Sequence, residues 1–141
     1  MLLLTHFIAS AILAAILFPF FGFYSLAVFI GGFLIDFDHV LFYLAKFKSL
    51  NLKKAHHYYR NIAVKKDMEE YKKVILVFHS IEFIALMLVL SFYYKPFLAL
   101  FMGAMLHMIM DMLYLYPTFK IMSIKKLSLF GQVKNAKEPN K

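Results

Sequence analysis

The chain has 141 residues, no cysteine and a formal net charge of +8. Its hydrophobic fraction of 62% exceeds the roughly 45–50% of ordinary soluble domains, and a protein this small has too much surface to bury the excess. These values favour a single membrane-embedded domain, and they exclude disulfides and thiolate metal sites.

Four apolar runs follow one another along the chain, at residues 2–18, 20–35, 74–94 and 97–116. Each approaches the ~20 residues that a helix needs to cross ~30 Å of hydrocarbon. We therefore predict an all-α, polytopic membrane domain over residues 1–118, with four transmembrane helices. The first run has no Lys or Arg before it, unlike a signal peptide, so we expect it to remain as a span.

Basic residues are concentrated in two places. The loop 46–73 carries nine Lys or Arg residues and the tail after Pro117 carries six, whereas the two opposite turns carry only Lys95. By the positive-inside rule, this asymmetry places both termini in the cytoplasm and the spans in a cytoplasmic (inner) membrane. Because the lysines flank the spans, we expect contact with membrane lipid and no nucleic-acid binding. The sequence indicates no particular protein partner.

Two segments outside the spans have recognisable patterns. Residues 60–73 mix both charges at helical spacing, and we expect a helix that continues into the third span. The tail 119–141 is expected to lie on the membrane surface over 119–130 and to be disordered over 131–141.

Acidic residues within or next to the apolar runs lie close to histidines. Four of the eight acidic residues are of this kind, each within four positions of a histidine: Asp36, Asp38, Glu82 and Asp111. A charged group at membrane depth costs about 2.5–3.5 kcal/mol on insertion scales, so it needs a compensating partner. On the four-span topology these acids and His6, His39, His79 and His107 fall at one depth, near the cytoplasmic side.

Three histidine–carboxylate pairs have spacings that place both members on one helix face. The pairs are His107 with Asp111, His79 with Glu82, and Asp36 with His39. Asp38 would point away from Asp36 in a continuous helix, so both converge only if the helix ends or unwinds there, which Gly31 and Gly32 would ease. Gly103, one turn before His107, would let another helix approach closely.

Imidazole nitrogens and carboxylate oxygens are the ligands that Zn, Mn or Fe uses when thiolates are absent. Up to eight such groups exceed the needs of one tetrahedral zinc; they suit two ions sharing a carboxylate, or one ion whose ligands are held by further carboxylates. Alone, each residue has a structural alternative: packing for His6, a helix terminus for the aspartates, and an ion pair for Glu82. In the loop, His56, His57 and Arg60 are either solvated or cap the site and bind phosphate.

The motifs LTH (4–6), DFDH (36–39), FHS (78–80) and HMIMD (107–111) resemble, in this order, the small membrane-bound metal-dependent hydrolases. Some members of that family are described as inner-membrane proteins that bind the SOS repressor, and the family is distantly similar to the zinc-dependent phospholipase C and single-strand nuclease superfamily. The resemblance covers roughly residues 4–115. It implies a helical hydrolase whose metal ligands are His6, Asp36, Asp38, His39, His79, His107 and Asp111.

The chain departs from that family at two positions. Ile35 stands where the family usually has proline, and VILVF (74–78) stands where it usually has a His-Arg pair before the His-Ser. Either the loop residues His56, His57 and Arg60 replace that pair as substrate-binding groups, or the function of the pair is missing from this chain.

We therefore expect a hydrolase that uses one or two divalent ions, zinc first and Mn or Fe next. Its substrate would be a phosphoester of a lipid or of another anionic amphiphile at the cytoplasmic face of the membrane. Glu82 and Asp38 are the candidate catalytic groups, with Glu82 as general base. The alternatives are a small metal-ion or proton transporter, and a non-catalytic scaffold with a structural metal. The apolar outer half of every span disfavours a pathway across the membrane.

Overall fold

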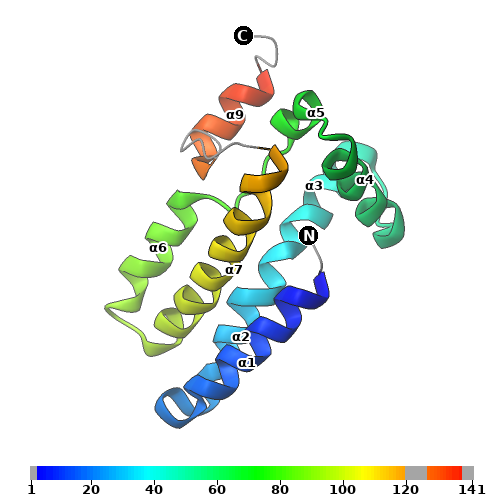
Figure 1. Ribbon diagram of the computed structural model, residues 1–141. Helices are drawn as coiled ribbons and strands as arrows, with labels where there is room; N and C mark the ends of the chain where they lie inside the picture. Colours follow the sequence, from blue (N-terminus) through cyan, green and yellow to red (C-terminus); the bar gives the residue numbers. More distant parts are fainter. Residues whose placement is uncertain (1–2, 120–126, 138–141) are drawn as a thin grey trace.

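The computed structural model describes residues 3–119 and 127–137, and the described residues form helices and turns without a strand. Helix α1 (Leu3–Phe21) leads into the short 3₁₀ helix η1 (Gly22–Tyr24), where the chain reverses and α2 (Ser25–Phe33) packs back along α1 (Figure 1). The predicted all-α fold class is confirmed for the described residues.

The chain then tightens into a second 3₁₀ turn, η2 (Leu34–Asp36), and continues as α3 (Phe37–Phe47). Helices α4 (Leu52–Lys65) and α5 (Met68–Lys73) follow and lie at the end of the molecule opposite η1 (Figure 1).

The second half of the chain begins with a non-helical segment, residues 74–80, which we call the arm; it is extended at Val74 and ends in a turn over 77–80. Helix α6 (Ile81–Ser91) and the long α7 (Lys95–Phe119) then form an antiparallel pair, and α9 (Leu129–Lys137) lies beside α5 at the same end as α4 (Figure 1). We refer to α4, α5 and α9 together as the cap.

The centre of the fold is a backbone-to-backbone contact between α2 and α7. A Cβ atom added to Gly31 would lie 2.2 Å from the carbonyl oxygen of Leu100, and one added to Gly103 would lie 2.0 Å from that of Val28. Only glycine fits at either position, so the close approach expected at Gly103 is confirmed. Nearby, Ala104 is fully buried, as small residues at a tight helix contact should be.

Two helical stretches are long and apolar enough to cross a membrane: Leu4–Phe47, which the chain reversal at η1 divides, and Lys95–Tyr114. Only 17% and 28% of their apolar windows are buried inside the molecule. Helix α1 exposes large apolar side chains at four-residue intervals, namely Leu4, Ile8, Ile12, Ile16 and Phe20. The apolar surface of these stretches therefore faces outward.

The third apolar run, 74–94, is not a continuous helix. Only Ile81–Ser91 is helical, because the Ser80 hydroxyl accepts a hydrogen bond from the Phe83 N–H (3.2 Å) and so begins α6 at Ile81. These 11 residues rise about 16 Å, roughly half of the hydrocarbon thickness. The described residues thus contain two stretches of spanning length, and not four separate helices of that length.

The expected single helix over residues 60–73 is also wrong. Helix α4 ends at Lys65, and Lys66 adopts a left-handed conformation with φ of 52°. The Asp67 carboxylate then accepts a hydrogen bond from the Glu70 N–H (3.0 Å) and begins a new helix, α5. The chain leaves α5 in an extended conformation at Val74, so no helix continues into the third run.

The expected disorder of residues 131–141 is wrong for the part that the structure describes. Residues Leu129–Lys137 form α9, and the Gln132 side chain on it is buried. Its composition suggested disorder because its stabilising partners lie far away in the sequence, in the arm and α6. The expected surface segment 119–130 falls largely outside the described residues, as do residues 138–141.

Candidate metal centre

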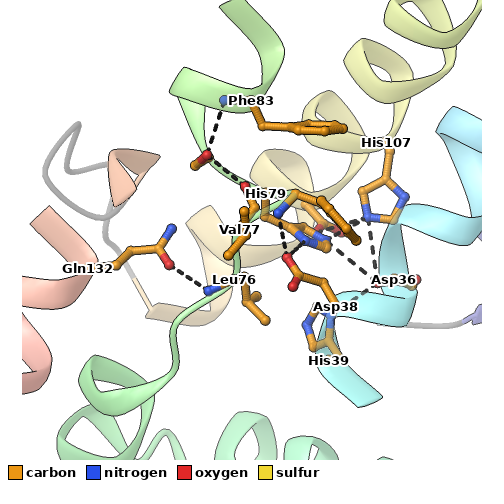
Figure 2. A network of polar contacts seen from close by, with 12 residues as sticks. Asp36, Asp38, His39, Leu76, Val77, His79, Phe83, His107 and Gln132 are labelled. Carbon is orange, nitrogen blue, oxygen red and sulfur yellow. Dashed lines mark hydrogen bonds and ion pairs between the residues drawn. The ribbon is translucent and has the colours of Figure 1, made fainter. Parts of the chain in front are cut away.

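Polar side chains from four elements meet inside the molecule on the cap side of the α2–α7 contact. They come from α1, from the η2–α3 junction, from the arm and from α7: His6, Asp36, Asp38, His39, His79, His107 and Asp111. We call this group the centre, and part of it is drawn in Figure 2. The structure therefore brings together all seven residues that the family resemblance implied as ligands.

The η2 turn makes both aspartates converge on one histidine. Because α2 ends at Phe33 and a 3₁₀ turn precedes α3, Asp36 and Asp38 lie on either side of the His79 ring. Asp36 Oδ1 lies 3.7 Å from His79 Nε2, and Asp38 Oδ2 lies 3.5 Å from His79 Nδ1. The predicted interruption of the helix is confirmed.

The Nε2 atoms of His79 and His107 face each other at 3.0 Å. Nδ1 of His107 lies 2.9 Å from the carbonyl oxygen of Gly32, and Nδ1 of His79 lies 3.5 Å from a carboxylate oxygen of Asp38. Both of these partners can only accept, so we assign a proton to each Nδ1. Each Nε2 then presents a lone pair, and two facing lone pairs repel unless a cation lies between them.

Two carboxylates approach the same pair of nitrogens. Oδ1 of Asp36 lies 3.6 Å from His107 Nε2, and Oδ2 of Asp111 lies 3.5 Å from His107 Nε2 and 3.6 Å from His79 Nε2. Ligand atoms held tetrahedrally about 2.0–2.2 Å from a zinc ion are about 3.3–3.6 Å from one another. The nitrogen–oxygen distances of 3.5–3.7 Å lie close to this range, and the two nitrogens lie closer together than it. Two sets of three residues, which share His107, could each hold an ion with one ligand atom per residue: His6, His107 and Asp111, and Asp36, His79 and His107.

Two more histidines flank this set. His6 Nε2 lies 3.2 Å from Asp111 Oδ1, and the His6 ring stacks on His107 with centroids 4.2 Å apart. His39 Nδ1 lies 3.4 Å from Asp36 Oδ1. The pairs predicted by helical spacing, His107 with Asp111 and Asp36 with His39, are therefore both in contact.

Several atoms of the centre are buried without a hydrogen-bond partner among the described residues. They are His6 Nδ1, Asp36 Oδ2, His39 Nδ1 and Asp111 Oδ1, of which the last two have only the imidazole–carboxylate contacts described above. A buried polar atom left unpaired costs about 1–3 kcal/mol, so His6 Nδ1 and Asp36 Oδ2 lie where a further partner would stabilise the fold. The donor set is rich in lone pairs and poor in protons, which is the chemistry of a cation site.

Asp38 lies behind His79, on the side away from the facing Nε2 atoms. Its Oδ2 accepts the backbone N–H of Phe78 at 2.6 Å and lies 3.5 Å from His79 Nδ1 (Figure 2). A carboxylate in this place fixes the tautomer and orientation of the imidazole. Its geometry is that of a residue that orients a ligand.

Among the residues that the structure describes, Glu82 contacts the C-terminal helix and no residue of the centre. Its two oxygens accept the Ser128 hydroxyl (2.6 Å) and the Leu129 N–H (2.8 Å). The expected face shared by His79 and Glu82 does not form, because His79 lies on the arm, before α6 begins.

The loop residues His56, His57 and Arg60 are exposed on α4. Helix α4 instead turns Ala55 and Tyr59 inward, and the Tyr59 hydroxyl donates to the carbonyl oxygen of His39 at 2.9 Å. The structure therefore does not bring the three predicted substrate-binding residues to the centre.

Sequence reasoning missed three groups that support the centre: Tyr59, the Gly32 carbonyl and Gln132. The inward stripe of Ala55, Tyr59 and Ile62 at helical spacing could have indicated Tyr59. A backbone carbonyl carries no side-chain signal, and an isolated glutamine in a polar tail carries none either.

A second polar cluster joins the end of α3 to the cap; it is formed by Lys46, Tyr58 and Glu70, and we call it the Lys46 cluster. The Lys46 ammonium group donates to Glu70 and to the Tyr58 hydroxyl (2.9 Å), and that hydroxyl donates to Glu70 at 2.7 Å. The hydrogen bonds from Lys46 and Tyr58 lower the pKa of Glu70 to about 2, and burial, followed by Glu70, raises the pKa of Tyr58. This cluster ties α3, α4 and α5 together.

Comparisons of the chain with protein-family models, with curated proteins and with solved structures found no match. The family resemblance accordingly depends on the four motifs alone.

Proposed function

We propose that the protein is a membrane-embedded hydrolase that depends on a divalent metal ion, with zinc as the preferred ion. His79, His107, Asp36 and Asp111 would hold it. The observation that carries this proposal is the 3.0 Å distance between the Nε2 atoms of His79 and His107. An acceptor next to Nδ1 of each ring orients the imidazole, so that its Nε2 lone pair points toward the other ring. An imidazole nitrogen has one lone pair, so His107 serves one ion in this arrangement, and a second ion would need outer oxygens of the carboxylates.

The membrane setting is part of the proposal. We infer four passes, made by α1, by α2 with the 3₁₀ turns η1 and η2 at its ends, by α6 with the arm before it, and by α7. The outward apolar surface of α1 and α7 supports this, because in water that surface would be exposed to solvent, whereas lipid would cover it. The loop 46–73 and the tail hold fifteen of the sixteen Lys and Arg residues, which supports a cytoplasmic cap and a cytoplasmic location for both termini.

The chemistry that suits the centre is hydrolysis. A bound zinc ion supplies a water of pKa near ~7 and neutralises charge on a phosphoester. Asp36 keeps Oδ2 free of hydrogen bonds, so we assign this oxygen as the general base in place of Glu82. The side chains of Asp36 and His39 are 10% and 21% exposed, more than any other side chain of the centre, so substrate would approach from their side.

The substrate we favour is a phosphoester of a lipid or of another anionic amphiphile. The centre lies toward the cap, close to the depth at which headgroups would sit. The exposed basic residues of α4, including Lys53, Lys54 and Arg60, provide a positive surface at that level.

A proton pathway is the alternative with an observation in its favour, because a proton between the two Nε2 atoms would also relieve their repulsion. However, apart from Lys95, no charged or imidazole side chain occurs in the halves of the helices near η1 and the α6–α7 turn. A proton or ion crossing the membrane would find no relay there. A scaffold with a structural metal remains as an outcome of the test.

The test is elemental analysis of the protein purified in detergent. We expect about one equivalent of zinc or manganese in the wild type and in His56→Ala, and loss of the ion in His107→Ala. His56 is a matched control because it is an exposed histidine outside the centre. No stoichiometric metal after reconstitution would overturn the proposal in favour of the proton pathway.

The catalytic part needs a separate assay. Metal-loaded protein should release product from phospholipids in mixed micelles, and Asp36→Asn should abolish this release. Metal bound without hydrolysis of any phosphoester lipid would indicate the structural-metal scaffold.

A further inference from the structure

The arm reaches the centre without a hydrogen-bonded ladder of its own. The backbone N–H of Leu76 donates to the side-chain oxygen of Gln132 (2.7 Å), and the N–H of Phe78 donates to Asp38 (2.6 Å) (Figure 2). Two amide groups of one non-helical segment, two residues apart, are therefore satisfied by side chains of α9 and α3. Neither acceptor is close to the arm in the sequence.

These acceptors matter because the arm is partly buried: Val74, His79 and Ser80 are buried, although Val77 is 46% exposed. An N–H group buried without a partner costs about 1–3 kcal/mol, and non-helical backbone inside a membrane protein is tolerated only where other groups satisfy it. Gln132 is only 4% exposed, and it is the one buried residue of α9. A buried glutamine whose oxygen accepts from the arm is an anchoring contact.

A second contact ties α9 to the chain just beyond the arm. The Glu82 carboxylate accepts the Ser128 hydroxyl (2.6 Å) and the Leu129 N–H (2.8 Å), and so begins α9. Leu76 and Glu82 lie three residues before and three residues after His79. The same helix is thus fastened on both sides of a residue of the centre.

We propose that α9 is a positioning element for the centre: Gln132 and Glu82 clamp the arm on both sides of His79 and hold its imidazole against His107. The part of this inference that concerns metal affinity rests on the metal centre proposed above. Its consequence is that docking of the C-terminal helix and occupancy of the centre are coupled, so that release of α9 weakens metal binding.

The clamp is tested first by amide hydrogen exchange of residues 74–80 in detergent, which requires no metal. Gln132→Leu removes the acceptor at similar volume, and we expect exchange at Leu76 to accelerate at least tenfold. Gln132→Glu keeps an acceptor oxygen and should restore much of the protection. Lys134→Leu is the matched control, because it also replaces a polar residue of α9 with leucine, but on the exposed face of the helix. Its arm should exchange at the wild-type rate.

Faster exchange in Gln132→Leu could also arise if the substitution itself prevented α9 from folding. A variant on the other side of the clamp, in which α9 keeps its own sequence, controls for this. Glu82→Ala leaves Gln132 in place but removes the two acceptors that begin α9, and it should also accelerate exchange over residues 74–80. Unchanged exchange in both Gln132→Leu and Glu82→Ala would overturn the clamp.

Zinc affinity then separates this inference from the proposed function. Gln132→Leu should bind zinc about 10–100-fold more weakly than the wild type, as expected when a group that orients a ligand is lost. Equal zinc affinity of wild type and variant would overturn the positioning role and leave the metal centre standing. If the wild type binds no zinc, the metal centre fails, and hydrogen exchange alone decides on the clamp.

Discussion

The two polar clusters of the molecule are built in opposite ways. The Lys46 cluster joins one cation, one hydroxyl and one carboxylate, and all three bond to one another. The centre gathers histidines and carboxylates with no lysine or arginine among its described contacts, and several of its buried atoms have no partner. The complete cluster stabilises the fold by itself, whereas the centre stabilises it fully only with the ion that we propose.

The same contrast appears in how the elements are held. The Lys46 cluster connects helices that are close in the sequence, within residues 46–70. The centre connects α1, the η2–α3 junction, the arm and α7, which span residues 6–111. Bringing so many distant polar groups together costs stability, so the centre is the region where a bound ion should change the molecule most.

The largest expected effect is that of metal removal. An ion present at about 1,000 times its dissociation constant stabilises the folded state by about 4 kcal/mol, so a chelator should lower the melting temperature of the wild type markedly. Asp111→Asn should melt at a temperature that no longer responds to the chelator. Glu70→Gln, in the complete cluster, should keep the full response; a loss of response there would erase the distinction between the clusters.

A smaller effect is expected at Asp38, which separates residues that hold the ion from residues that orient them. Asp38→Asn keeps an acceptor for the Phe78 N–H but lowers the negative charge beside His79. We expect zinc affinity to fall about 10–100-fold while saturating zinc still gives the wild-type stoichiometry. Calorimetric titration measures both quantities, and a lost equivalent would make Asp38 a direct ligand.

In the Lys46 cluster, the effect should be about 1 kcal/mol and should depend on pH. The pKa of Glu70 is lowered from 4.5 to about 2 in the folded protein. Its stabilisation is therefore present above pH 4.5 and is lost as the pH falls from 4.5 toward 2. The difference in melting temperature between wild type and Glu70→Gln should shrink over that range, and a constant difference would contradict the assignment.

The smallest effect is expected on the exposed face of α4. The substitutions His57→Ala and Arg60→Ala remove groups that make no contact with the centre, so zinc affinity should stay within about twofold of the wild type. Titration of each variant beside His79→Ala, which should lose the ion, provides the comparison. A large loss in Arg60→Ala would place this residue in the site after all.

Much of the centre was predictable because helical spacing is a local property. His107 with Asp111 and Asp36 with His39 meet as the three- and four-residue spacings require. The interruption between the two aspartates also followed from a local argument, since no continuous helix could direct Asp36 and Asp38 to one side. The glycine contact could be predicted at Gly103, where a small residue lies one turn from a candidate ligand.

The rest depended on contacts between residues far apart in the sequence. The third apolar run suggested a continuous helix by composition, but His79 reaches the centre from the turn that ends the arm, and α6 begins only after Ser80. Glu82 is three residues from His79, a spacing like those of the pairs that do form, but its carboxylate contacts Ser128 and Leu129 at the start of α9. The tail lacked the apolar residues that predict order, because Gln132 stabilises it through a single amide group. Hydropathy and spacing contain no information of this kind.

The contact between α2 and α7 also constrains how many residues of α7 can separate Gly103 from the centre. Gly103 lies four residues before His107, whose Nδ1 reaches the carbonyl of Gly32, the neighbour of Gly31. One inserted residue between Gly103 and His107 would turn the histidine by about 100° and shift it about 1.5 Å along the axis. The glycine contact therefore fixes the spacing between Gly103 and His107. Insertions or deletions can be accommodated in the turns at 48–51 and 92–94, but not between these two residues.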